Sequence, residues 1–345
     1  MGCQYPTNKD DNDLTTSKVE NLESNQDALP DNEMIESSSL PPELNHALRH
    51  KFNNQSLVPI KFFEITEEEF TGVLNRNLLA DNIIKLYTPQ LDEIEYEIDV
   101  KFRDVPPIKI LDPQGGIQYY KGGFNRQGQC HGKGIWIKDY DIYIGNFRND
   151  EFHGTGLFIT EQGDYYFGNW KNSQCNGYGS LMMDKKLVYQ GNFKNNKKEG
   201  YGEERYPNGD MYKGAFYDGE KNGKGQYIFM DGSRYDGNFR DSKYSGFGQI
   251  SLRGGDYIRG EFKDGKLNGQ GDFSWVDGTK FVGNFLDDIK NGEGTYVWKD
   301  GKSYKGVWDN NDVCGKGLLK NPNKGTQESV FINWFKYKNK INFNK

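Results

Sequence analysis

Aromatic residues and glycines alternate with polar residues in a pattern that repeats every 23 residues along most of the chain. In the stretch YKGAFYDGEKNGKGQYIFMDG, which begins at Tyr212, positions one and five are aromatic and position three is glycine. Glycines also occupy positions 12 and 14, and an Asp-Gly or Asn-Gly pair commonly fills positions 20 and 21. A fixed period of this length indicates a repeat architecture. Nine copies begin at residues 120, 143, 166, 189, 212, 235, 258, 281 and 304.

Each repeat predicts two short strands, at positions 1 to 5 and 12 to 18, that are joined by turns. A two-residue turn at Asp300-Gly301 would place Tyr296 and Tyr304 on opposite faces, whereas a three-residue loop with Gly301 as the bulge residue keeps them together. We therefore expect the bulged turn. In that register position 1 lies opposite 16, position 3 opposite 14 and position 5 opposite 12, on both sides of each strand.

This register predicts a row of glycines between two rows of apolar side chains. Glycine inside a strand commonly marks the close approach of another group. We expect both that neighbouring aromatic rings fold over the glycines and so supply the fold, and that the glycines line a trough that supplies the binding face for a helix or extended peptide of a partner protein. The predicted trough residues are Phe124, Phe147, Trp170, Phe193, Phe216, Phe239, Phe262, Phe285 and Trp308, with Gly145, Gly168, Gly191, Gly214, Gly237, Gly260, Gly283 and Gly306.

The pattern Y-x-G-x-F/W, six polar residues, Gly-x-Gly and a turn resembles the MORN repeat (membrane occupation and recognition nexus) from Tyr120 to about Lys324. Ile258 and Phe281 depart from it by replacing the first tyrosine. The resemblance implies an all-β array, an elongated single-layered antiparallel β-meander, that acts as a scaffold. It also implies a cytoplasmic location at the cell cortex, the cytoskeleton, a cilium or axoneme, or the cytoplasmic face of a membrane.

Composition and charge change near residue 106, which indicates a domain boundary. Residues 1–106 contain 9 Lys/Arg and 21 Asp/Glu, a net charge of −12, and the remainder carries +6. We expect a disordered acidic leader over residues 1–45, a helical segment with a capping strand over 46–106, the repeats over 107–326, and a capping strand with a basic tail over 327–345. A charge of +6 spread over so many residues does not predict nucleic-acid binding.

Helical spacing follows a T-x-x-E capping box that is formed by Thr66 and Glu69. The helical pattern extends over residues 62–87, and this segment either folds back on the array or docks on a partner. Alternating apolar residues over 94–102 predict a strand at the first edge of the array.

Gly2 and Cys3 follow the initiator methionine, as in chains that carry two acyl groups, although Pro6 stands where a myristoylation signal has Ser or Thr. Acylation of both residues would anchor the chain to a membrane. The alternative is an unmodified leader. The four cysteines show neither framework spacing nor a CxxC pair, a usage typical of intracellular proteins.

No motif in the sequence predicts catalysis, a metal, a cofactor or a small-molecule substrate. Cys130, His131 and His153 lack further ligands at metal-binding spacing, and no Gly-x-Gly pair is followed by the GK[ST] of a phosphate loop. The sequence therefore predicts a non-enzymatic scaffold that binds a protein partner. The alternatives are a phospholipid-binding tether that uses loop lysines such as Lys194, Lys197 and Lys198, or a regulatory subunit of an enzyme such as a lipid kinase.

Overall fold

The computed structural model describes residues 61–76, 80, 82–86, 106–111, 116–322 and 325–331. These residues belong to two compact units that divide between Met230 and Asp231. The predicted leader, its two acylation residues, the strand predicted over 94–102 and the tail after Phe331 lie outside the described residues.

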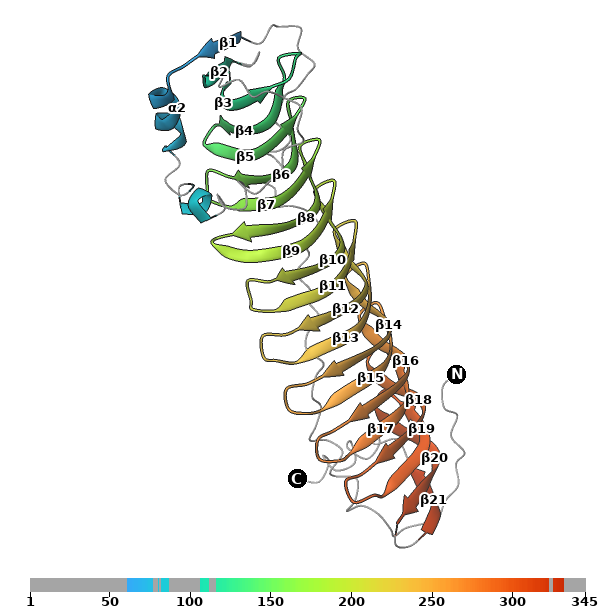
Figure 1. The fold of residues 1–345 in the computed structure, drawn as a ribbon. Coiled ribbons are helices and arrows are strands. Elements are labelled where there is room, and N and C mark those ends of the chain that lie inside the picture. Colours follow the sequence, from blue (N-terminus) through green and yellow to red (C-terminus); the bar gives the residue numbers. More distant parts are fainter. Residues whose placement is uncertain are drawn as a thin grey trace, which may run out of the picture. The chain divides into compact units, whose positions relative to one another are not determined.

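The first unit contains helix α2, further helical residues at 80 and 82–86, and twelve strands among its described residues (Figure 1). They are β1 (Lys61–Glu64), α2 (Glu67–Leu74), β2 (Ile108–Leu111), β3 (Ile117–Phe124), β4 (Cys130–Lys138), β5 (Asp141–Arg148), β6 (Glu151–Ile159), β7 (Tyr165–Lys171), β8 (Gln174–Met183), β9 (Lys186–Lys194), β10 (Lys197–Arg205), β11 (Met211–Tyr217) and β12 (Glu220–Ile228).

The second unit contains nine strands in its described part. They are β13 (Arg234–Arg240), β14 (Lys243–Ser251), β15 (Tyr257–Lys263), β16 (Lys266–Ser274), β17 (Lys280–Leu286), β18 (Ile289–Val297), β19 (Ser303–Asp309), β20 (Asp312–Asn321) and β21 (Gly325–Phe331). β21 pairs with β20 at the place where the sequence predicts a closing strand.

Within each unit every strand pairs antiparallel with the strand that follows it. The predicted antiparallel β-meander is thereby confirmed. At the start of the first unit the edge is formed by β1, which pairs with β2, where the sequence predicts helix from Phe62 onward. The helix itself begins after Thr66, whose side chain accepts a hydrogen bond from Glu69 N as the capping box predicts.

The predicted bulged turn is confirmed at Asp300-Gly301. Trp298 N donates to Lys302 O and Gly301 N donates to Trp298 O, both at 2.9 Å, and Gly301 has a φ of 81°. Tyr296 consequently pairs with Tyr304.

The other turn of repeats two to nine is tighter than expected, whereas repeat one has a wider loop there, in which Asn125 N donates to Gln129 O. Asn195 and Asn196, with φ of 50° and 67°, form the two-residue connection between β9 and β10. Asparagine tolerates this left-handed conformation. Most of the polar stretch that looked like a loop is therefore strand, and the strands are longer than predicted.

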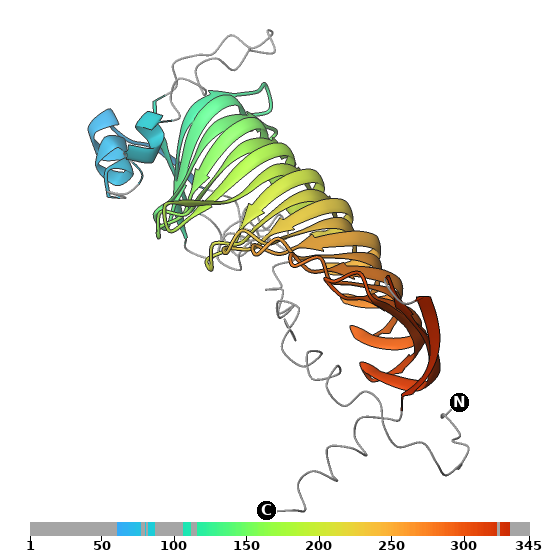
Figure 2. The same ribbon diagram turned by 90° about the horizontal axis from the view of Figure 1, so that it is seen from below.

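The predicted register is correct for positions 1 and 3 and partly wrong for position 5. Gly283 pairs with Gly294, which pairs with Gly306, as expected. Phe285, however, pairs with Lys290 at position 10 of its own repeat, because a bulge interrupts the ladder after Gly283. Bulges bend strands, and the strands of the first unit curve along their length (Figure 2).

The tyrosine at position 1 covers the glycines of its own hairpin. An ideal Cβ on Gly179 would lie 2.3 Å from the Tyr166 hydroxyl oxygen, and one on Gly168 would lie 2.6 Å from it. The same hydroxyl donates to the carbonyl of Asn169 at 3.1 Å. Six repeats share this bond, from Tyr120, Tyr143, Tyr166, Tyr189, Tyr212 and Tyr235 to the carbonyl three residues later.

Each ring at position 1 also joins two consecutive repeats. Tyr166 makes edge contacts with Trp170 of its own repeat and with Phe193 of the next, at centroid distances of 5.1 and 5.2 Å. Phe281 repeats this arrangement with Phe285 and Trp308 in the second unit. We call this side of the sheet the tyrosine face. It forms most of the core within each unit.

We expect Gly179→Ala to lower the free energy of unfolding by about 2 to 3 kcal/mol, because the added methyl group overlaps a fully buried ring and overpacking has costs of this size. Urea unfolding followed by tryptophan fluorescence measures the change. Gly72→Ala is the matched control, since a Cβ there meets nothing within 4 Å and alanine favours a helix by about 1 kcal/mol. Equal effects of the two substitutions would contradict the packing argument.

We expect Phe281→Tyr to stabilise the second unit by about 1 kcal/mol, the net value of one hydrogen bond. The new hydroxyl would reach the carbonyl of Asn284, as the hydroxyl of Tyr166 reaches that of Asn169. The reverse change, Tyr166→Phe, should destabilise the first unit by a similar amount. Thermal unfolding of the two variants tests this sign reversal, and a loss of stability in both would show that the hydroxyl is not the cause.

Candidate partner-binding surface

The aromatic residues predicted to flank a trough are buried in the structure. Phe147, Trp170, Phe193, Phe216, Phe239, Phe262, Phe285 and Trp308 are each at most 6% exposed. Phe124 in the first repeat is half-buried. The indole of Trp170 donates to the carbonyl of Gly156 at 3.0 Å. These side chains pack on the rings of their own and adjacent repeats, so they are not exposed ridges.

The glycines predicted to line the trough are also covered. A Cβ at Gly145, Gly168, Gly191, Gly214, Gly237, Gly260, Gly283 or Gly306 would lie less than 3 Å from a side chain of the tyrosine face. At Gly260, where Ile258 replaces tyrosine, Leu267 fills the space. The rings therefore lie over the glycines, as predicted for the fold, and the open trough predicted as the binding face is wrong. Partner binding by these residues stays a prediction that would require the rings to move.

The remaining candidate residues show no metal site. The thiols of Cys130 and Cys175 are buried and form no disulfide. Among the described residues, no group of three or more His, Cys, Asp and Glu side chains could hold a metal ion.

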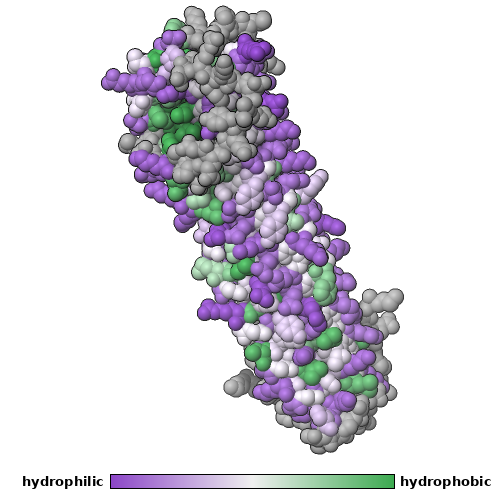
Figure 3. Space-filling model, viewed as in Figure 1, coloured by the Kyte–Doolittle hydropathy of each residue, from purple (hydrophilic) through white to green (hydrophobic). Residues whose placement is uncertain are grey.

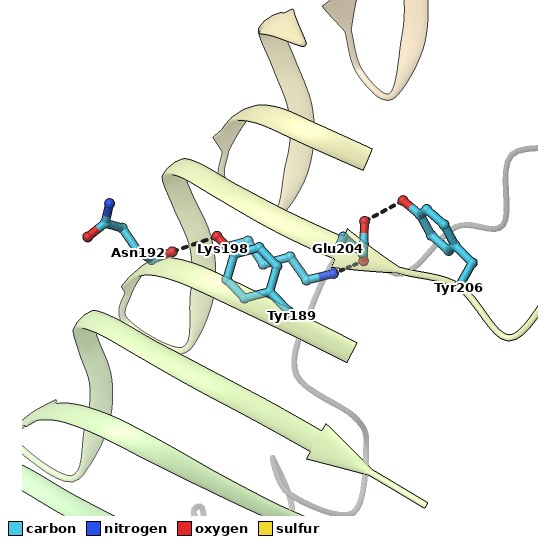
Figure 4. Close-up of polar contacts among 5 residues, drawn as sticks. All are labelled: Tyr189, Asn192, Lys198, Glu204 and Tyr206. Carbon is cyan, nitrogen blue, oxygen red and sulfur yellow. Dashed lines mark hydrogen bonds and ion pairs between the residues drawn. The ribbon is translucent and has the colours of Figure 1, made fainter. Parts of the chain in front are cut away.

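Lys198 is buried, although the sequence suggested an exposed loop lysine. It is 3% exposed and lies on the tyrosine face of repeat four. Its ammonium group forms an ion pair with Glu204, which also accepts a hydrogen bond from the hydroxyl of Tyr206 (Figure 4). A buried charge needs such a partner. Lys198 is consequently unsuited to lipid binding, and Lys197 beside it pairs with Asp218 at 2.5 Å.

Two further lysines at the same position of their repeats lie over aromatic rings. Lys221 lies 5.1 Å from the ring centroid of Tyr206 and 5.7 Å from that of Tyr227, and burial lowers its pKa. The ammonium nitrogen of Lys290 lies 5.3 to 5.6 Å from the ring centroids of Trp275, Phe281, Tyr296 and Trp308. Burial lowers the pKa of Lys290 to about 8. Burial likewise raises the pKa of the Tyr206 hydroxyl, with the Glu204 charge adding to the effect. Lys221 is buried and Lys290 is half-buried.

The opposite face of the first unit receives the helical segment that precedes the repeats. Phe70 and Val73 of α2, together with Ala80, pack into a cluster with Ile137, Ile142, Leu157, Ile159 and Tyr165. Lys121 binds Glu67 at 2.7 Å beside this contact. The chain's own helical segment thus docks on the array, which settles its position in favour of the first of the two alternatives.

Beyond this contact the opposite face carries three exposed tyrosines. Tyr178, Tyr201 and Tyr217 are 53%, 64% and 66% exposed. Tyr201 pairs with Ala215, and Tyr217 follows two residues later on the same face of β11, so the two tyrosines are diagonal neighbours. We call these three residues the tyrosine patch. Tyr178 and Tyr201 were missed because position 13 varies among repeats. Their signal was an aromatic residue between the two glycines of Gly-x-Gly in adjacent repeats, whereas Tyr217 lies at position 6 of its repeat.

The surface visible in Figure 3 is mainly hydrophilic, and hydrophobic residues form small separate groups. No helix in the described part of the chain has the length and apolar character needed to cross a bilayer.

Comparisons with known proteins address the family. No curated protein sequence matched the chain. The TCP10 domain of Danio rerio CPAP is similar over 65% of this chain and 98% of its own, at 12% identity and a TM-score of 0.28. The SAS-4 TCP domain of Drosophila melanogaster, solved with a proline-rich motif of Ana2, covers 69% of this chain and 95% of its own, at 13% identity and a TM-score of 0.15. These scores are too low to bear on function.

The profile of the MORN repeat matches eight segments: residues 120–138, 143–165, 166–182, 189–211, 212–234, 235–257, 259–280 and 281–303. The ninth copy predicted from residue 304 is not among them, although β19 and β20 pair as a further hairpin. The matches cover about half of the chain and coincide with the hairpins described above. The chain belongs to the MORN repeat family.

Proposed function

We propose that this MORN-repeat chain is a non-enzymatic scaffold that binds a partner protein on the face opposite its tyrosine face. The observation that carries the proposal is the tyrosine patch of Tyr178, Tyr201 and Tyr217, all more than half exposed. Tyrosine is enriched among the residues that dominate binding energy at protein interfaces.

The docked helical segment supports this proposal. It shows that the opposite face of the first unit already receives a peptide segment, on the repeats that precede the patch. The patch continues the same face into repeats three to five. The tyrosine face, in contrast, is filled by its own rings.

Location and anchoring stay predictions from the sequence. The resemblance to other MORN proteins favours the cytoskeleton, a cilium or the cytoplasmic face of a membrane. Acylation of Gly2 and Cys3 would anchor the chain at the cytoplasmic face of a membrane. Lipid binding by the repeats is the weaker alternative, because Lys198, one of the lysines that would bind the lipid, is buried and paired with Glu204. The partner of the scaffold could itself be an enzyme, such as a lipid kinase, for which this chain would be a regulatory subunit.

We expect a photoreactive benzoylphenylalanine at position 201 of the full chain to cross-link a partner protein in cells that express it. The aromatic probe replaces an exposed tyrosine and so stays within reach of a bound partner. Mass spectrometry identifies the adduct. Adding Tyr178→Ser and Tyr217→Ser should reduce its yield about tenfold or more, as expected for interface hot spots, without changing urea unfolding.

The same probe at Val276 is the control, because this residue is 74% exposed but lies in the second unit, away from the patch residues in sequence. Absence of a defined adduct at position 201, or the same adducts with equal yield at both positions, would overturn the proposal.

A further inference from the structure

Asparagine and tyrosine alternate in one row across four strands of the first unit. Tyr178 on β8 pairs with Asn192 on β9, and Tyr201 follows on β10, where it pairs with Ala215. At the other end, a Cβ on Gly177 would lie 3.0 Å from the Asn169 side chain. All four of these asparagines and tyrosines are exposed. We call Asn169, Tyr178, Asn192 and Tyr201 the amide–tyrosine row.

The bulges explain why this row projects from the sheet. Gly177 and Gly200 have φ of 104° and 67°, and each directly precedes one of the two tyrosines. The ladder between β7 and β8 shifts register at this point, as does the ladder between β9 and β10. The two tyrosines therefore occupy equivalent bulged sites that are one repeat apart.

The spacing of the two tyrosines matches one turn of a polyproline II helix. Strands lie roughly 4.8 Å apart, so residues separated by two strands are about 9.6 Å apart. Polyproline II rises about 3.1 Å per residue and has three residues per turn, a repeat of about 9.3 Å. Seven residues of an α-helix rise about 10.5 Å. A peptide with proline at every third position would meet one tyrosine with each turn.

The chemistry of the row favours the same ligand. A polyproline II segment makes no internal backbone hydrogen bonds, and its prolines dock in aromatic-lined grooves. The Asn192 amide, exposed between the two tyrosines, can donate to a peptide carbonyl. An α-helix satisfies its own backbone and requires an apolar stripe. Such a stripe is present on this face where α2 already docks.

Charge near the row indicates acidic residues in the ligand. Lys171 and Lys194 are exposed and occupy position 6 of consecutive repeats, and Lys224 is exposed at position 13 of the next repeat. None of the three forms an ion pair with a described residue. Cations close to an interface raise the rate of association with anionic partners.

We propose that the amide–tyrosine row binds an acidic proline-rich segment in the polyproline II conformation, aligned across the strands, with prolines three residues apart on Tyr178 and Tyr201. This inference rests on the proposed scaffold function and names the class of partner.

Fluorescence anisotropy with the full chain tests the inference. The probe is a fluorescein-labelled peptide of four Pro-Ala-Glu repeats, and the comparison peptide has the same composition with its prolines grouped together. We expect the regular peptide to bind at least about tenfold more tightly than the grouped one. Tyr201→Ser should weaken binding about tenfold and Asn192→Ala about threefold, within the range seen for interface truncations.

Phe247→Ser is the matched control variant. Phe247 occupies the same bulged position in repeat six and is 61% exposed, but the next repeat has Gln270 there instead of an aromatic residue. It should leave the affinity for the probe unchanged.

Equal binding of the two peptides, or an affinity that Tyr201→Ser does not change, would overturn the inference. If neither peptide binds while the photo-cross-link at position 201 persists, the scaffold proposal holds and the proline-rich class is wrong. If the cross-linked partner site maps to an acidic proline-rich segment and the regular peptide competes with it, the inference is supported.

Discussion

The packing of one aromatic ring over two cross-strand glycines is the contact on which the rest of the structure depends. Both glycines must lack a Cβ for the ring to lie flat on the backbone, and a side chain at either position would overlap the ring or the facing strand. The hydroxyl then reaches a carbonyl beside the bulge. A single-layered sheet has no second layer to cover it, so this contact provides the buried core that such a sheet otherwise lacks.

Contacts between consecutive repeats extend this packing along each unit. The tyrosine ring at position 1 makes edge-to-face contacts with the position-5 ring of its own repeat and with that of the next repeat. At the tight turns, a side chain binds the backbone of the preceding repeat, as Asn196 does with the amide of Cys175 at 2.7 Å. At the wider turns the bond runs to the following repeat, as Asp164 of repeat two accepts from the amide of Asp184 in repeat three at 3.0 Å. Stability in such an array is close to a sum over neighbouring pairs.

Much of the fold followed from the 23-residue period, because parity restricts which residues share a face. The pairing of Tyr296 with Tyr304 and the glycine row could be predicted from it. The bulge before position 14 could not, since a Gly-x-Gly pair is compatible with regular strand. The expected trough is closed by the tyrosine ring over the glycines, and the tyrosine hydroxyl binds a carbonyl on the strand that faces the bulge. Lys198 was misassigned because hydrophilic character indicates exposure, whereas its ion-pair partner Glu204 lies on the adjoining part of the same buried face. Tyr178 and Tyr201 gave only a weak signal at a variable position.

The buried ion pair of repeat four has a consequence for how the array can change during evolution. Repeats built only from aromatic and glycine contacts are interchangeable in principle, and duplication or loss of one leaves equivalent surfaces to rejoin. Repeat four buries Glu204 with Lys198, and Lys221 of repeat five lies over Tyr206 of repeat four. Separating the two repeats would leave Lys221 without that ring and without the nearby carboxylate. Repeats four and five are therefore coupled by a buried lysine as well as by ring contacts, and Lys290 of repeat eight couples its neighbours in the same way through Trp275 and Trp308. Loss of a single hairpin at either place would remove a partner of a buried lysine.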